Sequence, residues 1–198
     1  MNRETVRALC QLNTEFYERN AASFSQTRTA PWEGWRRCMA ACGFDDSDEA
    51  LGQSMDTQIA DSVLDIACGN LRFEAFLANT YPHVDWSFFA VDNCEPLVAS
   101  SQEGIAKKVH FTCEDIVSNL IEGLPAAEPA NIPALAAATP FELVVSFGFM
   151  HHIPSFNLRL QFLLEALNQV KPGGYLAVSF WQFLNDPAKR AKIEQTHA

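Results

Sequence analysis

The stretch Ser62-Val-Leu-Asp-Ile-Ala-Cys-Gly-Asn-Leu-Arg72 decides the fold of this chain. It begins with the apolar, partly β-branched run of a buried parallel strand, and Asp65 lies where that strand ends. Ala67 and Gly69 allow the backbone to approach a ligand closely, and Asn70 can cap the helix that follows. An ordinary strand-to-helix turn has the same pattern, so the rest of the chain must distinguish the two readings.

The composition predicts one globular domain. The chain has 198 residues, of which 48% are hydrophobic, which is enough for a single substantial core. Because no apolar run reaches the length of a membrane span and the first residues lack the apolar core of a signal peptide, we expect a cytoplasmic protein without a membrane partner. The six cysteines are scattered, and their spacing matches neither a disulfide framework nor a metal site.

The charge disfavours an extended nucleic-acid surface, since such a surface needs clustered Lys and Arg. The formal net charge is −10, and no Lys or Arg lies between Arg37 and Arg72, a segment that contains seven acidic residues. Arg28, Arg36 and Arg37 could still form one local basic patch, although a solvated helix face explains the last two better.

The hydrophobic pattern predicts alternating helices and strands. Residues 1–45 form an N-terminal helical cover, with a first helix over 5–20 whose apolar residues are Val6, Leu9, Leu12, Phe16 and Tyr17. Residues 60–183 form an α/β core, with strands at 62–67, 86–91, 109–113, 141–147 and 175–181, the last one following a tight turn at 172–174. A Pro/Ala-rich surface insertion occupies 119–140. The predicted fold is a Rossmann-like, mostly parallel sheet with helices on both faces.

Three successive strands end in acids, at Asp65, Asp92 and Asp115. The carboxyl ends of parallel strands line one crevice, so we expect these side chains to lie close together. Asp92 follows Asp65 by 27 residues, close to the spacing of about 20 residues at which an acid meets ribose hydroxyls in nucleotide crevices. The sequence therefore predicts a nucleoside-type ligand.

These motifs resemble, in order, those of the class I S-adenosylmethionine-dependent methyltransferases. The matching segments, from Phe16 to Phe183, include Val63-Leu-Asp-Ile-Ala-Cys-Gly69, Ala-Val-Asp92, Cys113-Glu-Asp115, Leu143-Val-Val-Ser-Phe-Gly-Phe-Met-His-His-Ile153 and Val170-Lys-Pro-Gly-Gly-Tyr-Leu-Ala-Val178. The resemblance implies S-adenosylmethionine as the cofactor. Its implied ligands are Asp65, Ala67 and Gly69 around the methionine part, Asp92 and Asn93 at the ribose, Asp115 and Ile116 at the adenine, and Phe147 near the sulfonium.

The cofactor loop departs from the family pattern at two positions. Ala67 and Leu71 occupy places where the family usually has glycine, and we expect the bulky Leu71 to narrow the pocket or weaken cofactor binding. The same departure disfavours a dinucleotide, whose pyrophosphate needs the close approach that G-x-G-x-x-G permits.

The N-terminal segment resembles a branch of this superfamily, the wobble-uridine tRNA methyltransferases that esterify a carboxymethyl group. The matching points are Phe24-Ser25, Thr27-Arg28, Pro31-Trp32, the pair His151-His152 with Arg159, and Trp181. By this resemblance Tyr17 and Arg28 close on the cofactor, Arg28 pairing with its carboxylate. Without it, Tyr17 is equally well explained as a core residue and Arg28 as a surface arginine.

His151 and His152 are candidates for the acceptor side of the active site. The alternative is that one packs under the preceding strand and the other bonds a loop. Adjacent side chains diverge and no third ligand is close in sequence, so we predict no metal site. No nucleophilic residue is required, because methyl transfer from a sulfonium is an in-line displacement that depends on positioning and desolvation.

The predicted fifth strand lies near the end of the sequence, so the further strands usual in this fold are expected to be missing, and its edge could pair with a second copy in a homo-oligomer. The acceptor stays open between tRNA and a small molecule. Two alternatives remain: a non-catalytic methyltransferase-like partner subunit, and a nicotinamide-dependent oxidoreductase.

Overall fold

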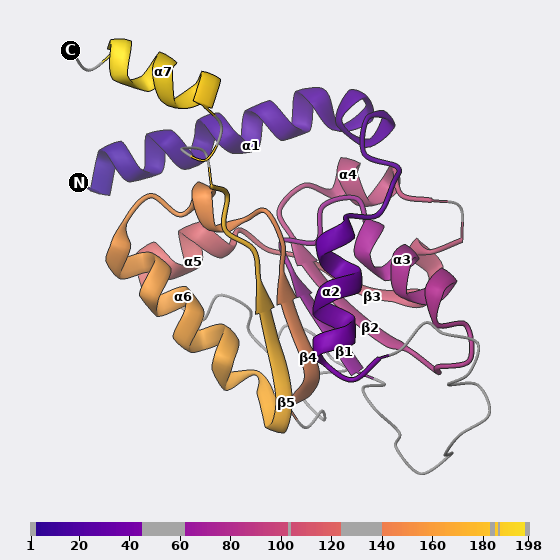
Figure 1. The fold of residues 1–198 in the computed structure, drawn as a ribbon. Coiled ribbons are helices and arrows are strands. Elements are labelled where there is room, and N and C mark those ends of the chain that lie inside the picture. Colours follow the sequence, from indigo (N-terminus) through magenta and orange to yellow (C-terminus); the bar gives the residue numbers. More distant parts are fainter. Residues whose placement is uncertain are drawn as a thin grey trace.

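The computed structural model describes residues 3–44, 62–102, 104–123, 140–182, 185 and 187–196. Within these residues the chain forms a five-stranded, wholly parallel sheet with the order β3-β2-β1-β4-β5 (Figure 1). The strands are β1 (Ser62–Ile66), β2 (Ser87–Asp92), β3 (Val109–Cys113), β4 (Phe141–Ser146) and β5 (Val170–Val178). The predicted α/β class and parallel sheet are confirmed.

Helices cover both faces of the sheet and its carboxyl edge. Figure 1 shows α2 and α3 on one face, α5 and α6 on the other, and α1 lying across the carboxyl ends of the strands. The helices are α1 (Arg3–Gln26), α2 (Glu33–Ala41), α3 (Arg72–Thr80), α4 (Glu95–Ala99), α5 (Ile116–Glu122), α6 (Phe156–Asn168) and α7 (Pro187–Thr196). None of the helices in the described part of the chain has both the length and the apolar character that crossing a bilayer requires.

The described residues form three apolar clusters, two of them on opposite faces of the sheet and a small third one where α1 meets α4. Successive strand residues point to opposite faces, so Leu64 and Ile66 of β1 belong to the cluster under α5 and α6. Val63 belongs to the cluster under α2 and α3, together with Trp35 and Leu77. Asp65 is in phase with Val63 and therefore lies on the α2/α3 face of the sheet.

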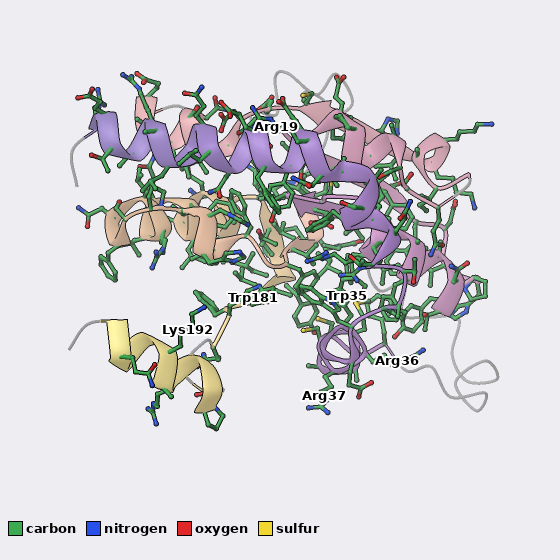
Figure 2. The ribbon with its side chains drawn as sticks, turned by 90° about the horizontal axis from the view of Figure 1, so that it is seen from above. Arg19, Trp35, Arg36, Arg37, Trp181 and Lys192 are labelled. Atoms are coloured by element: carbon green, nitrogen blue, oxygen red, sulfur yellow. The ribbon has the colours of Figure 1, made fainter. Side chains whose placement is uncertain are left out.

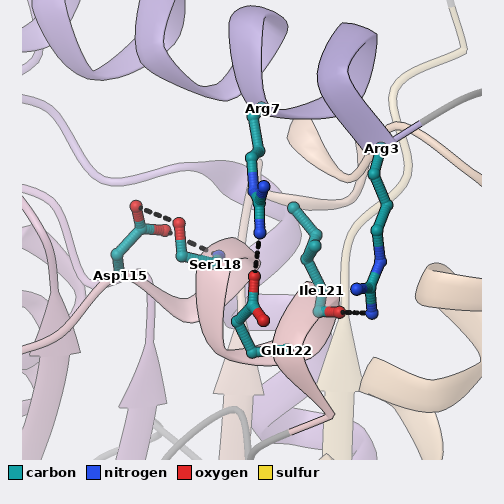
Figure 3. A network of polar contacts seen from close by, with 6 residues as sticks. All are labelled: Arg3, Arg7, Asp115, Ser118, Ile121 and Glu122. Carbon is teal, nitrogen blue, oxygen red and sulfur yellow. Dashed lines mark hydrogen bonds and ion pairs between the residues drawn. The ribbon is translucent and has the colours of Figure 1, made fainter.

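Helix α1 is fastened over the edge of the sheet by polar contacts from its inner face. Arg3 donates a hydrogen bond to the carbonyl of Ile121 at 2.9 Å, and Arg7 forms an ion pair with Glu122 (Figure 3). Farther along α1, the amide of Asn93, just after β2, donates to the hydroxyl of Thr14 at 3.0 Å. Helix α1, which covers the strand ends and is called the lid below, is thus held to the end of β2 and to α5.

The apolar face predicted for α1 is only partly correct. Val6 is buried, but Leu12 and Phe16 are 63% and 54% exposed. The buried residues of α1 are Val6, Ala21 and Ser25, and Cys10 and Tyr17 are partly buried. Cys10 and Tyr17 line the cavity, whereas Ala21 packs against Leu97 of α4 and the Ser25 hydroxyl is hydrogen-bonded to that of Ser100. The helix also extends past the predicted range of 5–20.

Two further boundaries differ from the prediction. Residues 119–122, expected at the start of the Pro/Ala-rich insertion, belong to α5, and 124–139 lie outside the described residues. The predicted turn at 172–174 is part of β5, where the pairing with β4 shifts register between Phe141 and Leu143. A Cβ on Gly174 would lie 2.6 Å from the carbonyl oxygen of Glu142, so only glycine allows this approach.

Candidate active site

A cavity of about 300 Å³ lies at the carboxyl ends of the strands, beneath α1. This volume is at the lower end of the range of roughly 300–1,000 Å³ typical of small-molecule and cofactor sites. Every residue predicted for the site lines it: Tyr17, Arg28, Asp65, Ala67, Gly69, Asp92, Asn93, Asp115, Ile116, Phe147, His151 and His152. The fold thus brings residues from distant parts of the sequence to one cavity.

The loop after β1 uses left-handed backbone conformations at alternate residues. The φ angles of Ala67, Gly69 and Leu71 are 67°, 59° and 56°, and Ala67 and Leu71 are the non-glycine residues with positive φ in the described chain. These are the two positions where the sequence departs from glycine. Leu71 is fully buried in the α2/α3 cluster and does not line the cavity, so the expectation that it narrows the pocket is wrong. The predicted cap by Asn70 is also wrong, because Leu71 is the N-cap of α3 and the Asn70 amide donates to the Arg28 carbonyl at 3.4 Å.

Asp92 connects this loop to β2. Its Oδ2 accepts a hydrogen bond from the Gly69 N–H at 2.8 Å, and its Oδ1 accepts one from the Cys94 N–H at 2.9 Å. Burial raises the pKa of Asp92, and these backbone donors oppose that shift. Each carboxylate oxygen has a second lone pair, so Asp92 can still accept two hydroxyl groups from a ligand.

Two carboxyl oxygens in the cavity lining have no hydrogen-bond partner among the described residues. They are Oδ1 of Asp65 and Oε1 of Glu114, and both are buried. A buried, unpaired acceptor costs free energy of about 1–3 kcal/mol, so each of these oxygens favours a ligand that carries a donor. Glu114 was not among the predicted site residues, although it precedes Asp115 at the end of β3.

Asp115 has a structural role that the sequence reading missed. It is the N-cap of α5, and its carboxylate accepts hydrogen bonds from the Ser118 N–H at 3.0 Å and the Ser118 hydroxyl at 2.8 Å (Figure 3). The signal was present in the sequence, since Asp followed three residues later by Ser precedes the apolar run of α5. Asp115 lines the cavity while it caps this helix.

Two arginines and several aromatic rings form part of the cavity wall. The Arg28 guanidinium lies 3.6 Å from the centre of the Phe24 ring, and that of Arg72 lies 5.1 and 5.0 Å from the rings of Trp32 and Trp35. Nε of Arg72 is buried without a hydrogen-bond partner in the described chain. Burial lowers the pKa of Arg72, and the positive charge of Arg28 lowers it further. This wall of the cavity therefore favours an anionic group.

The histidines lie at the end of the cavity next to β4. Tyr17 of α1 is hydrogen-bonded through its hydroxyl to Nε2 of His152 at 3.1 Å, and His151 lies 5.3 Å from Trp181 between ring centres. Burial, with a smaller effect of His151, lowers the pKa of His152 to about 4. Burial also lowers the pKa of His151. Both rings are thus neutral at neutral pH, and the described residues contain no group of side chains able to hold a metal ion.

A profile of the family described as "Methyltransferase domain" matches residues 64–178, more than half of the 198 residues. The chain belongs to this methyltransferase family. The matched segment runs from β1 to β5 and so contains the cofactor loop, the strand ends and the histidines. Segments outside it, including α1, supply the lid.

Solved structures confirm the methyltransferase fold. The complex of DhpI with SAM and HEP is 16% identical, with a TM-score of 0.51 over 96% of this chain and 70% of DhpI. Human N-acetylserotonin methyltransferase in complex with SAM is 17% identical, with a TM-score of 0.51 over 84% of this chain and 40% of the human one. No curated protein sequence matches the chain.

The cavity of this methyltransferase fits the cofactor that the sequence resemblance implies. Its acids follow three adjacent strands, and Arg28 and Arg72 also line it. Hydroxyl and ammonium groups of a ligand can donate to the acids, including the unpaired oxygen of Asp65, and a carboxylate can pair with an arginine.

Several lining residues were missed from the sequence. Arg72, Trp35 and Phe73 line the cavity because α2 and α3 pack beside its mouth, a tertiary arrangement that no local pattern reveals. Gly148 is explained by the structure, since its φ is 74°, a conformation that favours glycine, and it lies against Trp32 and Trp181.

Proposed function

We propose that this methyltransferase uses S-adenosylmethionine and that its acceptor is a carboxymethyl-modified uridine at the wobble position of a tRNA. The observation that supports this acceptor is the position of Arg72, which borders two cavities. One is the main cavity, and the other has a volume of about 430 Å³ and is lined in part by α2 and α3. An acceptor with a planar base and a neighbouring phosphate can occupy both.

In the proposed complex, the cofactor lies along the strand ends. Asp92 and Asn93 hold the ribose, Asp115 and Ile116 meet the adenine, and Asp65 receives the ammonium group through its unpaired oxygen. Ala67 and Gly69 allow close approach of the methionine part. Tyr17 of α1 and Arg28, which follows that helix, close the cavity. The guanidinium of Arg28 pairs with the cofactor carboxylate.

The chemistry suits an acceptor that is already an anion. The bound cofactor supplies a methyl group on a positively charged sulfur. With the cofactor bound, transfer of this methyl group to a carboxylate oxygen, with cleavage of the carbon–sulfur bond, would give a neutral ester and a thioether without removal of a proton. His151 and His152 orient the acceptor in this scheme, and the low pKa of His152, about 4, makes it a weak base. Phe147 lies near the transfer point, in contact with Phe73 at 5.0 Å between ring centres.

The second cavity supports a polynucleotide acceptor. Its described lining is polar and contains two arginines and no acidic residue: Thr29, Pro31, Arg36, Arg72, Phe76, Asn79, Thr80 and Gln102. Arg36 also lies 5.7 Å from the ring of Phe76. Arg36 and Arg37 project outward from α2 (Figure 2). Arginine binds phosphate oxygens in a bidentate geometry, so this cavity suits a backbone phosphate next to the modified base.

Two charge-reversal variants, one in the second cavity and one on α1, test whether the acceptor is a tRNA. We expect tRNA bearing the carboxymethyl group to yield methyl ester and S-adenosylhomocysteine, and Arg36→Glu to weaken tRNA binding several-fold and lower its salt dependence by about one charge. Arg19→Glu, the same change at an exposed site on α1, is the control and should alter binding much less. Equal losses in the two variants, or turnover of the free nucleoside as fast as of the tRNA, would contradict a tRNA acceptor.

A small-molecule acceptor is the second candidate, because the net charge of −10 opposes a large nucleic-acid surface. The same main cavity then holds an aromatic or planar acid beside Arg72. Absence of measurable tRNA binding at low salt, combined with methylation of small carboxylic acids, would favour this candidate.

A further inference from the structure

A buried acid that the proposed chemistry does not use lies directly behind the cofactor loop. Glu74 belongs to α3, in the run Phe73–Leu77 in which every residue is buried. Its exposed fraction is 0%, and neither of its carboxyl oxygens has a hydrogen-bond partner among the described residues. Glu74 does not line the cavity, so any effect on a ligand must pass through a neighbour.

That neighbour is Asp65. The alternation of β1 places Asp65 on the α2/α3 face of the sheet, where α3 packs, and the two carboxyl groups interact. Asp65 is 3% exposed, and its unpaired Oδ1 is part of the cavity wall. We call these two residues the carboxyl pair. Asp65 borders the cavity, whereas Glu74 is fully buried and does not border it.

No cation of the described part of the chain affects the ionisation of the carboxyl pair. Asp92 of β2 raises the pKa of Asp65, and both members of the pair raise the pKa of Cys68 in the loop. Arg72 begins α3 but lies against the rings of Trp32 and Trp35. Two neighbouring carboxylates without a cation cannot both be ionised cheaply in a buried site. Burial accordingly raises the pKa of Glu74 to about 7 and that of Asp65 well above its usual range.

We propose that Glu74 is a positioning residue through which Asp65 retains a proton in the free carboxyl pair, and that this shared proton is released to solvent when a cationic ligand group binds beside Asp65. The pair then becomes doubly ionised, with one carboxylate neutralised by the ligand. The inference rests on the proposed cofactor, whose ammonium group is the cation. Cofactor affinity should therefore increase with pH up to about the pKa of the pair and level off above it.

Calorimetric titration with S-adenosylhomocysteine tests the proposal. In the full-length protein we expect the logarithm of the association constant to rise with pH between 6 and 7 with a slope between zero and one. At pH 6.5 the binding enthalpy should differ between buffers of different ionisation enthalpy, which reports proton release. Glu74→Gln keeps the shape but cannot ionise, so it should still bind the ligand with a flattened slope and a buffer-independent enthalpy. Glu33→Gln, an exposed acid on α2, is the control and should keep the wild-type slope.

A wild-type slope of zero, or a wild-type slope retained in Glu74→Gln, would overturn the proposal. Failure of the wild-type protein to bind the ligand at any pH would instead reject the proposed cofactor. If Glu74→Gln does not fold, infrared spectroscopy of the wild-type protein decides: the carbonyl band of a protonated carboxyl group should disappear when the ligand binds. Persistence of that band, or its absence from the free protein, would contradict proton release.

Discussion

Ala67 and Leu71 of the cofactor loop have left-handed backbone conformations although they are not glycine. Replacing them by glycine should change the stability of the protein in opposite directions. A left-handed conformation costs a non-glycine residue about 1–2 kcal/mol, whereas glycine costs about 0.5–1 kcal/mol in backbone entropy. Ala67, with φ 67°, has only a methyl group to lose, so Ala67→Gly should stabilise the fold by about 0.5–1 kcal/mol. Leu71 has the same backbone strain but is fully buried.

The buried side chain reverses the sign at Leu71. Removing a buried leucine costs about 2–5 kcal/mol, which exceeds the strain that glycine would relieve. We therefore expect Leu71→Gly to destabilise the protein by about 2–4 kcal/mol, or at least about 4 °C in Tm for a domain of this size. Because Leu71 lies outside the cavity lining, cofactor affinity measured on the folded variant should stay within about twofold.

Thermal unfolding followed by calorimetry measures both variants. Gly69→Ala measures the cost of backbone strain alone, because the φ of Gly69 is 59° and no atom lies within 4 Å of the added Cβ. We expect this variant to lose about 1–2 kcal/mol of stability. A stabilised Leu71→Gly, or a destabilised Ala67→Gly, would refute the reasoning that packing holds Leu71 in a glycine conformation.

Three further outcomes follow from the site. Asp115→Ala should destabilise the protein by about 1 kcal/mol through loss of the α5 cap, while Asp115→Asn retains most of it; chemical denaturation measures both. Glu74→Gln should be more stable than the wild type at pH 8 and lose that advantage as the pH falls below 7, because the raised pKa of Glu74 penalises its ionised form. The free energy of unfolding should fall as the pH is lowered from 6.5 to 4 through the depressed pKa of His152, and His152→Gln should reduce that dependence; an unchanged profile would contradict a buried neutral ring.

The parts of the fold with short-range signals could be predicted from the sequence. Strands such as Val109–Cys113 and the turn into α3 are encoded in runs of a few residues, and their acids mark one crevice once the sheet is parallel. The left-handed loop was signalled indirectly, because Ala67 and Leu71 stand where glycine was expected.

What could not be predicted depends on tertiary packing. The exposed Leu12 and Phe16 misled the assignment of the inner face of α1, because that face borders the cavity through Cys10 and Tyr17 and packs against α4 through Ala21. Arg72 reaches the cavity only because α2 places Trp32 and Trp35 beneath it. The burial of Glu74 had a faint signal, an acid inside an otherwise apolar run, but its contact with Asp65 requires the packing of α3 on the sheet.

The strand order explains why the acceptor should enter beside β4. The sheet order β3-β2-β1-β4 puts Asp115, Asp92 and Asp65 in line, so a ligand held by all three runs along the edge in the direction of β4. In the proposed placement the adenine would lie at β3, the ribose at β2 and the amino-acid part at β1, so that the sulfonium, which joins the ribose to the amino-acid part, would lie between them. Phe147 and the histidines follow β4, and Trp32 and Trp181 close on Gly148 there. In the proposed placement, an acceptor that enters beside β4 would therefore approach the sulfonium next to Phe147 and the histidines.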